Sequence, residues 1–352
     1  MKPSSNRQGR QKIFAWVVFG CIALAVCYTS LVILRASAEA DNVKAAGQRT
    51  PLPIARPDEL EAIQNQPYLI FLQQEEPPYG QVTLTGFDRA FPQSARTALL
   101  CDRIHYAAGN GICLRYDPTV SDSLAPPRVW VTLFGSDFKP RYKFPVDGVL
   151  SRARVSPDGK YAAFTVFVSG HSYDDVNMST ATTLLDTATG ASLGNLEEFE
   201  TWKDGQLYQA PGFNFWGVTF AKDSNRFYAT LQNGNATYLV QGDVAARKLT
   251  VLHEGVECPS LSPDGTRIAF KKRTASGRWQ LTVLDLATMK EIPLAEKGGI
   301  DDQVEWLDNQ RILYQKPDFD PPKWVSVFVL PADGSGKPEI FIPNATSPVV
   351  VP

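Results

Sequence analysis

Two segments of this chain have nearly the same sequence. One runs from Arg154 to Phe164 and the other from Ser260 to Phe270, and each carries Ser-Pro-Asp-Gly between two apolar stretches. Proline fixes φ at the first turn position and glycine supplies a positive φ at a later one, so each segment is typical of a strand, a tight turn and a second strand. A hairpin that recurs along a chain indicates a repeat fold.

Two weaker copies extend the pattern and give four turn aspartates: Asp158, Asp223, Asp264 and Asp308. The last two intervals, 41 and 44 residues, fit four strands with their turns, which is one blade of a β-propeller. The first interval, 65 residues, is longer than a blade. We expect the surplus between Gly190 and Phe213, where the sequence is polar and irregular.

The repeats predict an all-β fold over residues 67–352, a β-propeller of four-stranded blades. Six blades are expected, since two further blades fit between Tyr68 and Leu150, with five or seven as the alternatives. The terminal segment Pro348–Val351 is predicted to complete a blade begun at the N-terminal end, which closes the ring and leaves few free sheet edges. Composition agrees, because 25 glycines and 26 prolines with only three methionines are typical of a turn-rich β protein.

The N-terminal segment has the pattern of a membrane anchor. Residues 13–34 form an uncharged run of 22 residues, long enough as a helix to cross a hydrocarbon core of about 30 Å. The basic residues in the stub 1–12 predict that the stub stays cytoplasmic and that the rest of the chain is extracytoplasmic. A cleaved signal peptide is the alternative, because Ala36-Ser37-Ala38 resembles a cleavage site. Residues 35–66 are interpreted as a linker.

The cysteines fit a location outside the cytoplasm. Asn110-Gly111 predicts a hairpin that brings Cys101 and Cys113 together on adjacent strands. Since disulfides persist outside the cytoplasm, we predict a Cys101–Cys113 bond, with two buried thiols as the alternative. Cys258 has no evident partner and is interpreted as a small buried residue.

The Ser-Pro-Asp-Gly unit, followed by a strand that ends in Leu-Asp-x-x-Thr-Gly or Leu-Asp-x-Ala-Thr, resembles the WD40-like repeat of TolB-type propellers. Thr183–Gly190 and Leu284–Thr288 carry the second signature. The chain also resembles bacterial TolB-like proteins that are secreted or anchored, through Asn214–Phe220 and Glu257–Gly265. TolB itself has an α/β domain before its propeller, where this sequence shows only the predicted anchor and linker. The Tol–Pal role is therefore not carried over.

Alignment of the copies on their turn aspartates identifies candidate channel residues. Seven positions before each aspartate lie residues that should begin the innermost strands: Ser151, Trp216, Glu257 and Asp301. Arg152 and Asp302 adjoin two of them. We predict that these side chains surround a funnel that recognises a polar ligand or a peptide terminus. The alternative is that they only hydrate the mouth of the channel.

A second candidate is the polar loop Gly170–Asp175, in which we predict that His171 and Asp174 bind a ligand. The loop holds a base, a nucleophile and an acid side by side, but adjacency in sequence is not triad geometry. No residue is assigned a catalytic role.

Metal and nucleic-acid patterns are lacking. The sequence has no Cys-x-x-Cys and no His-Glu-x-x-His, and Asp301-Asp302 lacks the spacing of an ordered calcium loop, so no metal and no cofactor is predicted. A net charge of −2 argues against a nucleic-acid partner. Lys271-Lys272-Arg273 is interpreted as a solvated strand edge.

Together these patterns predict a single-pass protein of the cell membrane whose propeller lies outside the cytoplasm. We predict a binding or scaffold module that contacts an envelope protein or a polar ligand. The alternatives are a hydrolase or lyase with its site in the propeller funnel, and a purely structural protein of the cell envelope.

Overall fold

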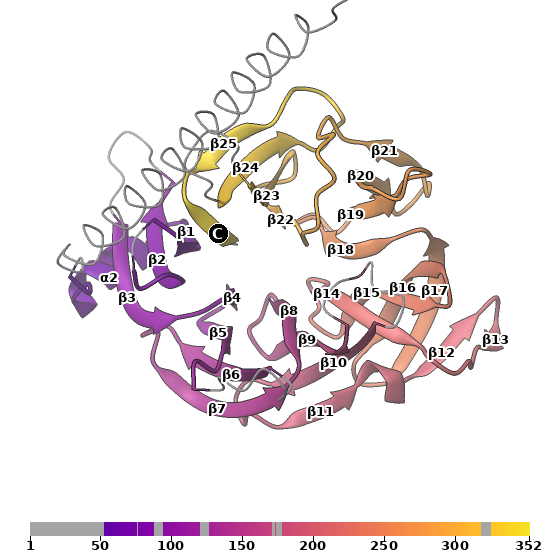
Figure 1. Cartoon of the computed structure of the whole chain (residues 1–352), viewed down its shortest axis with the longest axis horizontal. Helices are drawn as coiled ribbons and strands as arrows, with labels where there is room; N and C mark the ends of the chain where they lie inside the picture. The colour runs from indigo at the N-terminus through magenta and orange to yellow at the C-terminus, as the bar shows by residue number, and fades with distance from the viewer. Residues whose placement is uncertain are drawn as a thin grey trace, which may run out of the picture. The chain divides into compact units, whose positions relative to one another are not determined.

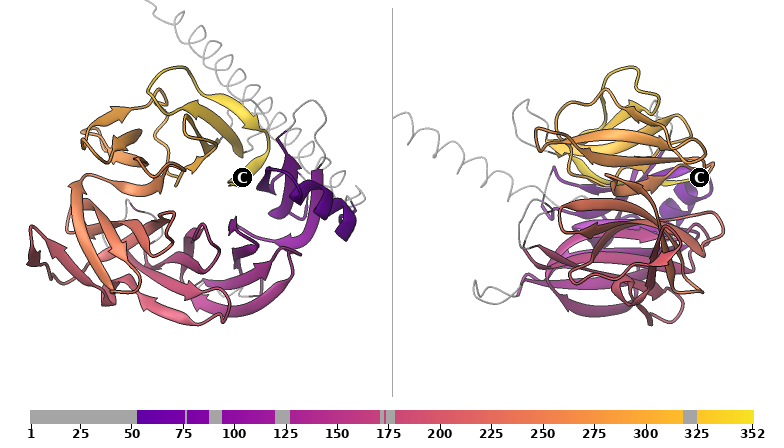
Figure 2. Two further views of the ribbon diagram at one scale, coloured as in Figure 1. Left: turned by 180° about the vertical axis from the view of Figure 1, so that it is seen from behind. Right: turned by 90° about the vertical axis from the view of Figure 1, so that its right-hand side faces the viewer.

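The computed structural model describes residues 53–75, 77–87, 94–119, 127–170, 173, 178–317 and 325–352. From residue 52 onward the chain is one compact unit, a β-propeller of six blades (Figure 1). The blades follow one another around the ring in chain order. Figure 2 shows the same ring from behind and from its side.

Each blade contains an antiparallel sheet of four strands. From the axis outward, the strands of the first blade are β26 (Ala345–Val351), β1 (Tyr68–Gln73), β2 (Gln81–Gly86) and β3 (Ser94–Leu100). In the same order, the second blade is β4 (Arg103–Ala107), β5 (Asn110–Tyr116), β6 (Arg128–Gly135) and β7 (Pro140–Asp147). The third is β8 (Val149–Val155), β9 (Tyr161–Ser169), β10 (Ser179–Asp186) and β11 (Ser192–Asn195).

The remaining blades follow the same plan. The fourth is β14 (Asn214–Phe220), β15 (Arg226–Asn233), β16 (Ala236–Asp243) and β17 (Lys248–Glu254). The fifth is β18 (Glu257–Leu261), β19 (Arg267–Arg273), β20 (Trp279–Asp285) and β21 (Glu291–Pro293). The sixth is β22 (Glu305–Trp306), β23 (Arg311–Pro317), β24 (Val325–Pro331) and β25 (Glu339–Ile342). The six-bladed fold predicted from the turn spacing is confirmed.

The two ends of the propeller close the ring within the first blade. Strand β26 pairs antiparallel with β1, and Ile70 lies opposite Val349. Leu69 of β1 also packs with Leu313 and Val327 of the sixth blade in one apolar cluster. The predicted closure by the C-terminal strand is therefore confirmed, and it gives β1 a hydrogen-bonded neighbour on both sides.

Apolar side chains fill the spaces between neighbouring blades. Ile112 and Val131 of the second blade share a cluster with Phe164 and Val166 of the third, and all four are buried. A single blade cannot bury both its faces, so stacking the sheets around an axis supplies the apolar burial that stabilises them.

The surplus before the fourth blade extends its sheet. A 3-10 helix (η1, Leu196–Glu198) leads to β12 (Glu200–Lys203), which pairs parallel with β17, and to β13 (Gln206–Leu207). Leu196 and Phe199 are buried in the core of the third and fourth blades and thereby attach this segment to the propeller. The insertion lies where the spacing predicted it, but it is ordered as strands rather than irregular.

Helix α2 (Pro57–Gln64) precedes the first strand, in a segment that the sequence placed in the linker. Proline stands at its first turn, and the Glu59 carboxylate accepts a hydrogen bond from the Arg56 N–H at 2.8 Å. Ile63 is buried against Ile70 and Leu84 of the first blade, so the helix belongs to the folded unit. None of the described helices is long and apolar enough to cross a membrane. The predicted stub and anchor, residues 1–34, lie outside the described residues.

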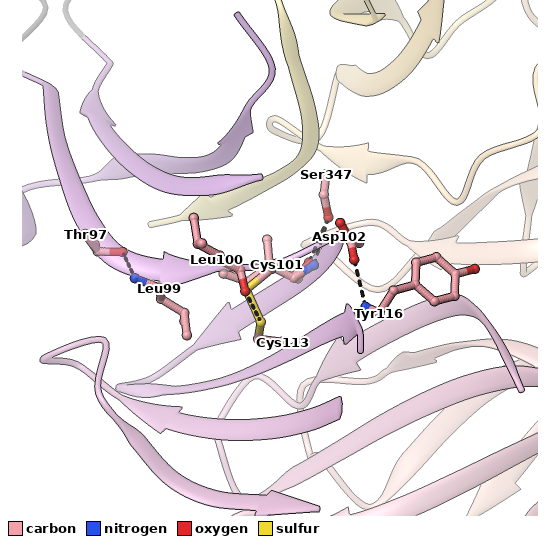
Figure 3. The surroundings of a disulfide bond; sticks show 9 residues. Thr97, Leu99, Leu100, Cys101, Asp102, Cys113, Tyr116 and Ser347 are labelled. Carbon is pink, nitrogen blue, oxygen red and sulfur yellow. Dashed lines mark hydrogen bonds between the residues drawn. A yellow bond between two sulfur atoms is a disulfide. The ribbon is translucent and has the colours of Figure 1, made fainter. Parts of the chain in front are cut away.

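The predicted disulfide is present (Figure 3). The predicted turn at Asn110-Gly111 is wrong, because both residues lie in β5 and the chain reverses at Ala108 and Gly109, which have positive φ. Cys113 lies on β5 and Cys101 lies two residues before β4, with their Cα atoms 5.5 Å apart. Between them, the Asp102 carboxylate accepts a hydrogen bond from the Tyr116 N–H at 2.8 Å (Figure 3). The bond thus fixes the start of the second blade's inner strand. Cys258 is a buried free thiol, as expected.

Candidate binding site at the channel

The innermost strands carry the candidate site because they face the axis (Figure 1). Strands β8, β14 and β18 each contain a register shift near their first residues, where the predicted site residues lie. Such bulges bend a strand and re-aim its side chains. In β14 the bulge requires Gly217, which has φ +66°, because a Cβ there would lie 2.7 Å from the Cα of Cys258.

An aromatic cluster forms where these strands begin, an end of the channel that we call the mouth. It consists of Phe167, Tyr173, Met178, Trp216, Cys258 and Trp279. The rings of Tyr173 and Trp216 stack with their centroids 4.7 Å apart. The Trp216 Nε1–H is buried and has no hydrogen-bond partner within the described part of the chain.

Lys271 lies fully buried beside this cluster. Its Nζ is 4.7 Å from the centroid of the Tyr173 ring and 4.0 Å from that of Trp279, within the range of cation–π attraction. The interpretation of Lys271 as part of a solvated edge is wrong. Its position on β19 directs the side chain inward, where two aromatic ring faces and a carboxylate stabilise the positive charge of the lysine.

Asp301 binds two cations at the mouth. Its Oδ1 accepts from Lys271 Nζ at 2.5 Å and from Arg152 at 2.9 Å. Burial alone would raise the pKa of the Asp301 carboxyl, but the positive charges of Lys271 and Arg152 outweigh burial and lower the pKa to about 2. Asp301 is therefore ionised at neutral pH.

Glu257 is hydrogen-bonded to the same cluster. It accepts a hydrogen bond from Trp279 Nε1 at 3.0 Å and lies 3.4 Å from Arg273 Nε. Arg273 in turn donates to the backbone oxygen of Tyr173 at 3.3 Å, and the Tyr173 hydroxyl is 2.5 Å from Ser151 Oγ. Burial raises the pKa of Tyr173, so its phenol is neutral. These contacts fix the ring of Tyr173 between Trp216 and Lys271.

An arginine cluster lies deeper in the channel. It consists of Arg103, Arg152, Arg154, Asp302 and Glu305, which together line a cavity of about 20 Å³. Arg103 is 3.3 Å from Asp302, and Arg154 binds Glu305. The cavity walls come from β4 and β8, from the residues around the start of β22, and from Ser347 and Pro348 of β26.

The loop that carries Asp301 and Asp302 is held by Glu296 and Gln303. Glu296 accepts hydrogen bonds from the Tyr314 hydroxyl at 2.6 Å and from Lys316 at 2.7 Å. Gln303 donates to the backbone oxygens of Val218 and Pro259, which lie at the bulges of β14 and β18. The two aspartates are thereby positioned by neighbouring blades.

The structure brings together six residues that the sequence singled out: Ser151, Arg152, Trp216, Glu257, Asp301 and Asp302. The prediction that Asp301 begins an inner strand is wrong, because it lies in the loop before β22. His171 and Asp174 lie outside the described residues, although Tyr173 of the same loop reaches the aromatic cluster. Among the described residues, no three His, Cys, Asp or Glu side chains gather in a way that could hold a metal ion.

Sequence reasoning missed Arg103, Arg154, Lys271 and Glu305. A signal existed for Arg154, because it lies two residues beyond Arg152 in a strand whose side chains alternate in direction. No repeat signature marks Arg103 or Lys271. Only the pairing of strands shows that they reach the axis.

Comparison with solved structures gives the same fold. The crystal structure of TolB from Acinetobacter baumannii matches with a TM-score of 0.51 and 12% identity, over 81% of this chain and 66% of that one. The structure of putative TolB from Agrobacterium tumefaciens matches at 0.47 and 15%, over 78% and 87%. A chain of a nidogen/laminin complex matches at 0.49 and 10%, over 81% and 98%.

At 12% identity the likeness to the Acinetobacter TolB shows the fold alone, a propeller of the TolB type as the repeat predicted. This chain spans slightly less than two thirds of that TolB chain. No protein-family model matches the sequence, and no curated protein matches it.

Proposed function

We propose that this protein is a membrane-anchored, extracytoplasmic propeller that binds an envelope protein or another polar ligand at the mouth of its channel. The observation that carries the proposal is the pairing of the buried cations Lys271 and Arg152 with the partly exposed Asp301 beside the aromatic cluster. Burying charged side chains costs folding free energy, whereas apolar packing between blades does not. Charged and aromatic groups fixed around one opening are suited to recognition.

Binding is favoured over acid–base catalysis by the state of the carboxylates. A general acid or base works best with a pKa near the operating pH. Lys271 and Arg152 lower the pKa of Asp301 to about 2, and the charge of Arg154 outweighs burial and lowers the pKa of Glu305. Both groups are thus ionised and paired with cations at neutral pH.

Site-specific photo-crosslinking in intact cells tests where a partner binds. Ala275 lies on the loop between β19 and β20 at the mouth, and Ala287 lies on the turn between β20 and β21 at the opposite face; both are exposed. We expect a photoreactive residue at Ala275, but not at Ala287, to capture a discrete partner. Capture from Ala287 alone would contradict binding at the mouth.

Cell fractionation tests the anchor. A full chain with a C-terminal tag should sediment with membranes and expose its tag to protease outside the cytoplasm. Two arginines inserted in the run 13–34 should abolish both properties, because charges at the centre of a bilayer are costly. A shortened, soluble exported product would favour the cleaved signal peptide, and tagged protein in the cytosol would contradict export.

A further inference from the structure

The cavity within the arginine cluster has room for one water-sized particle or one small ion. Its volume of about 20 Å³ exceeds the roughly 10–15 Å³ that a single water-sized particle needs. The site is built from the first, second, third and sixth blades, so it forms only when the ring is closed.

The walls of this cavity carry an excess of positive charge. Three guanidinium groups face two carboxylates, Asp302 and Glu305. Asp301 does not remove the excess, because the same Oδ1 that binds Arg152 also binds Lys271.

His105 lines the cavity without adding charge to it. Its Nδ1 accepts the Val155 N–H at 3.1 Å, and burial, followed by the charge of Arg154, lowers its pKa. One buried positive charge is left without a counter-charge among the described residues.

The same arginines hold unused hydrogen-bond donors. The Nε–H groups of Arg103, Arg152 and Arg154 are inaccessible to solvent and have no partner within the described ranges. Arg152 and Arg154 are only 6% and 8% exposed. Buried guanidinium donors nearly always find an acceptor, so the arginines that line this cavity retain unused hydrogen-bonding capacity.

We infer that the centre of the channel binds one small monovalent anion, either a halide or a single carboxylate group. One negative charge would balance the excess, and an anion accepts several N–H donors at once. Sulfate or phosphate would carry more negative charge than the excess requires. The inference concerns a site deeper than the mouth and does not depend on the proposed function.

Thermal unfolding of the full chain in detergent tests this binding at constant ionic strength. The salts are sodium chloride, sodium formate and, as a bulky monovalent control, sodium methanesulfonate. We expect chloride or formate to raise the unfolding midpoint by about 3 °C with saturation, while methanesulfonate does not. A response to formate but not chloride would identify a carboxylate site, and a response to chloride but not formate a halide site.

Two variants and one direct measurement decide the location. Arg103→Gln should abolish the response, whereas Arg128→Gln, which removes an exposed arginine paired with Asp147, should keep it. In crystals of the parent protein grown with bromide, an anomalous peak is expected in the cavity. Equal effects of all three salts, a response that survives in Arg103→Gln, or bromide absent from a water-filled cavity would overturn the inference. The crystal measurement stands even if Arg103→Gln does not fold.

Discussion

At the scale of single residues, the channel holds charged side chains in a largely buried environment. Lys271 lies beneath two aromatic faces and beside Asp301, which is 40% exposed while Lys271 is fully buried. The anion in this group therefore keeps much of its hydration, whereas its cations do not. Removing the lysine and removing the aspartate should have unequal effects.

We expect Lys271→Met to change the free energy of unfolding by less than about 1 kcal/mol, because Asp301 keeps Arg152 and the apolar side chain suits the rings. Asp301→Asn should cost about 3 kcal/mol, because it leaves Lys271 and Arg152 buried without their counter-charge. Urea unfolding of both variants measures the difference. A larger loss for Lys271→Met than for Asp301→Asn would show that this account is wrong.

His105 makes stability depend on pH. Its pKa in the folded protein lies below the ordinary 6.5, so below about pH 6.5 the unfolded chain binds a proton that the folded chain excludes. The free energy of unfolding should therefore fall as the pH drops from 7.5 to 5.5. In His105→Asn, whose amide oxygen can accept the Val155 N–H, we expect a smaller fall. Denaturant titrations at the two pH values test this, and an identical fall in both proteins counts against it.

At the scale of elements, the repeated turns are held by their own aspartates. Asp264 Oδ1 accepts from the Ser262 hydroxyl at 2.6 Å, the Thr266 N–H at 3.0 Å and the Thr266 hydroxyl at 2.7 Å. The other repeat aspartates, Asp158, Asp223 and Asp308, accept from backbone N–H groups of their own turns. This explains why the turn, rather than a core pattern, is the part of the blade that recurs in sequence.

We expect Asp264→Ala to lower the free energy of unfolding by about 2 kcal/mol, since the turn loses three hydrogen bonds. Asp137→Ala is the control, because among the described residues that exposed carboxylate accepts only the Lys139 N–H besides an ion pair to the same lysine. Burial opposes ionisation of Asp264, but its hydrogen bonds prevail and lower the pKa to about 2, so its contribution should be lost as the pH falls from about 4 to 2. Unfolding curves that match those of the parent protein would refute this role.

The disulfide at the start of the second blade should be intact in exported protein. It closes a short loop, so replacing both Cys101 and Cys113 by alanine should cost about 2–3 kcal/mol. Intact-mass measurement before and after alkylation checks the bond directly. Finding two free thiols in protein recovered from outside the cytoplasm would contradict it.

At the scale of the whole molecule, closure through β26 joins the first and sixth blades. Ser347 on this strand exchanges hydrogen bonds with the backbone of Ile104, and its own N–H donates to the side-chain oxygen of Gln315. A single strand thus links three blades around the arginine cluster.

A chain that ends at Asn344 should therefore lose cooperative unfolding, since β1 loses its inner partner and Val349 leaves the core. Removal of Pro352 alone, which lies beyond β26, is the control. Calorimetry of the three chains measures the effect. A single sharp transition in the truncated chain at the parent's temperature would show that closure is not needed.

The all-β repeat, six blades, the closing strand and the disulfide were predictable without coordinates, because turn chemistry and strand spacing are local and recur along the chain. The repeat register also pointed to Arg152, Trp216, Glu257, Asp301 and Asp302, since it places these positions near the start of the inner strands, although the two aspartates lie in the loop before β22. The burial of Lys271, and the position of Arg103, Arg154 and Glu305 around one cavity, became visible only once the strands were paired and the blades packed. These side chains come from different blades, and their burial and charge balance depend on how the ring brings the blades together.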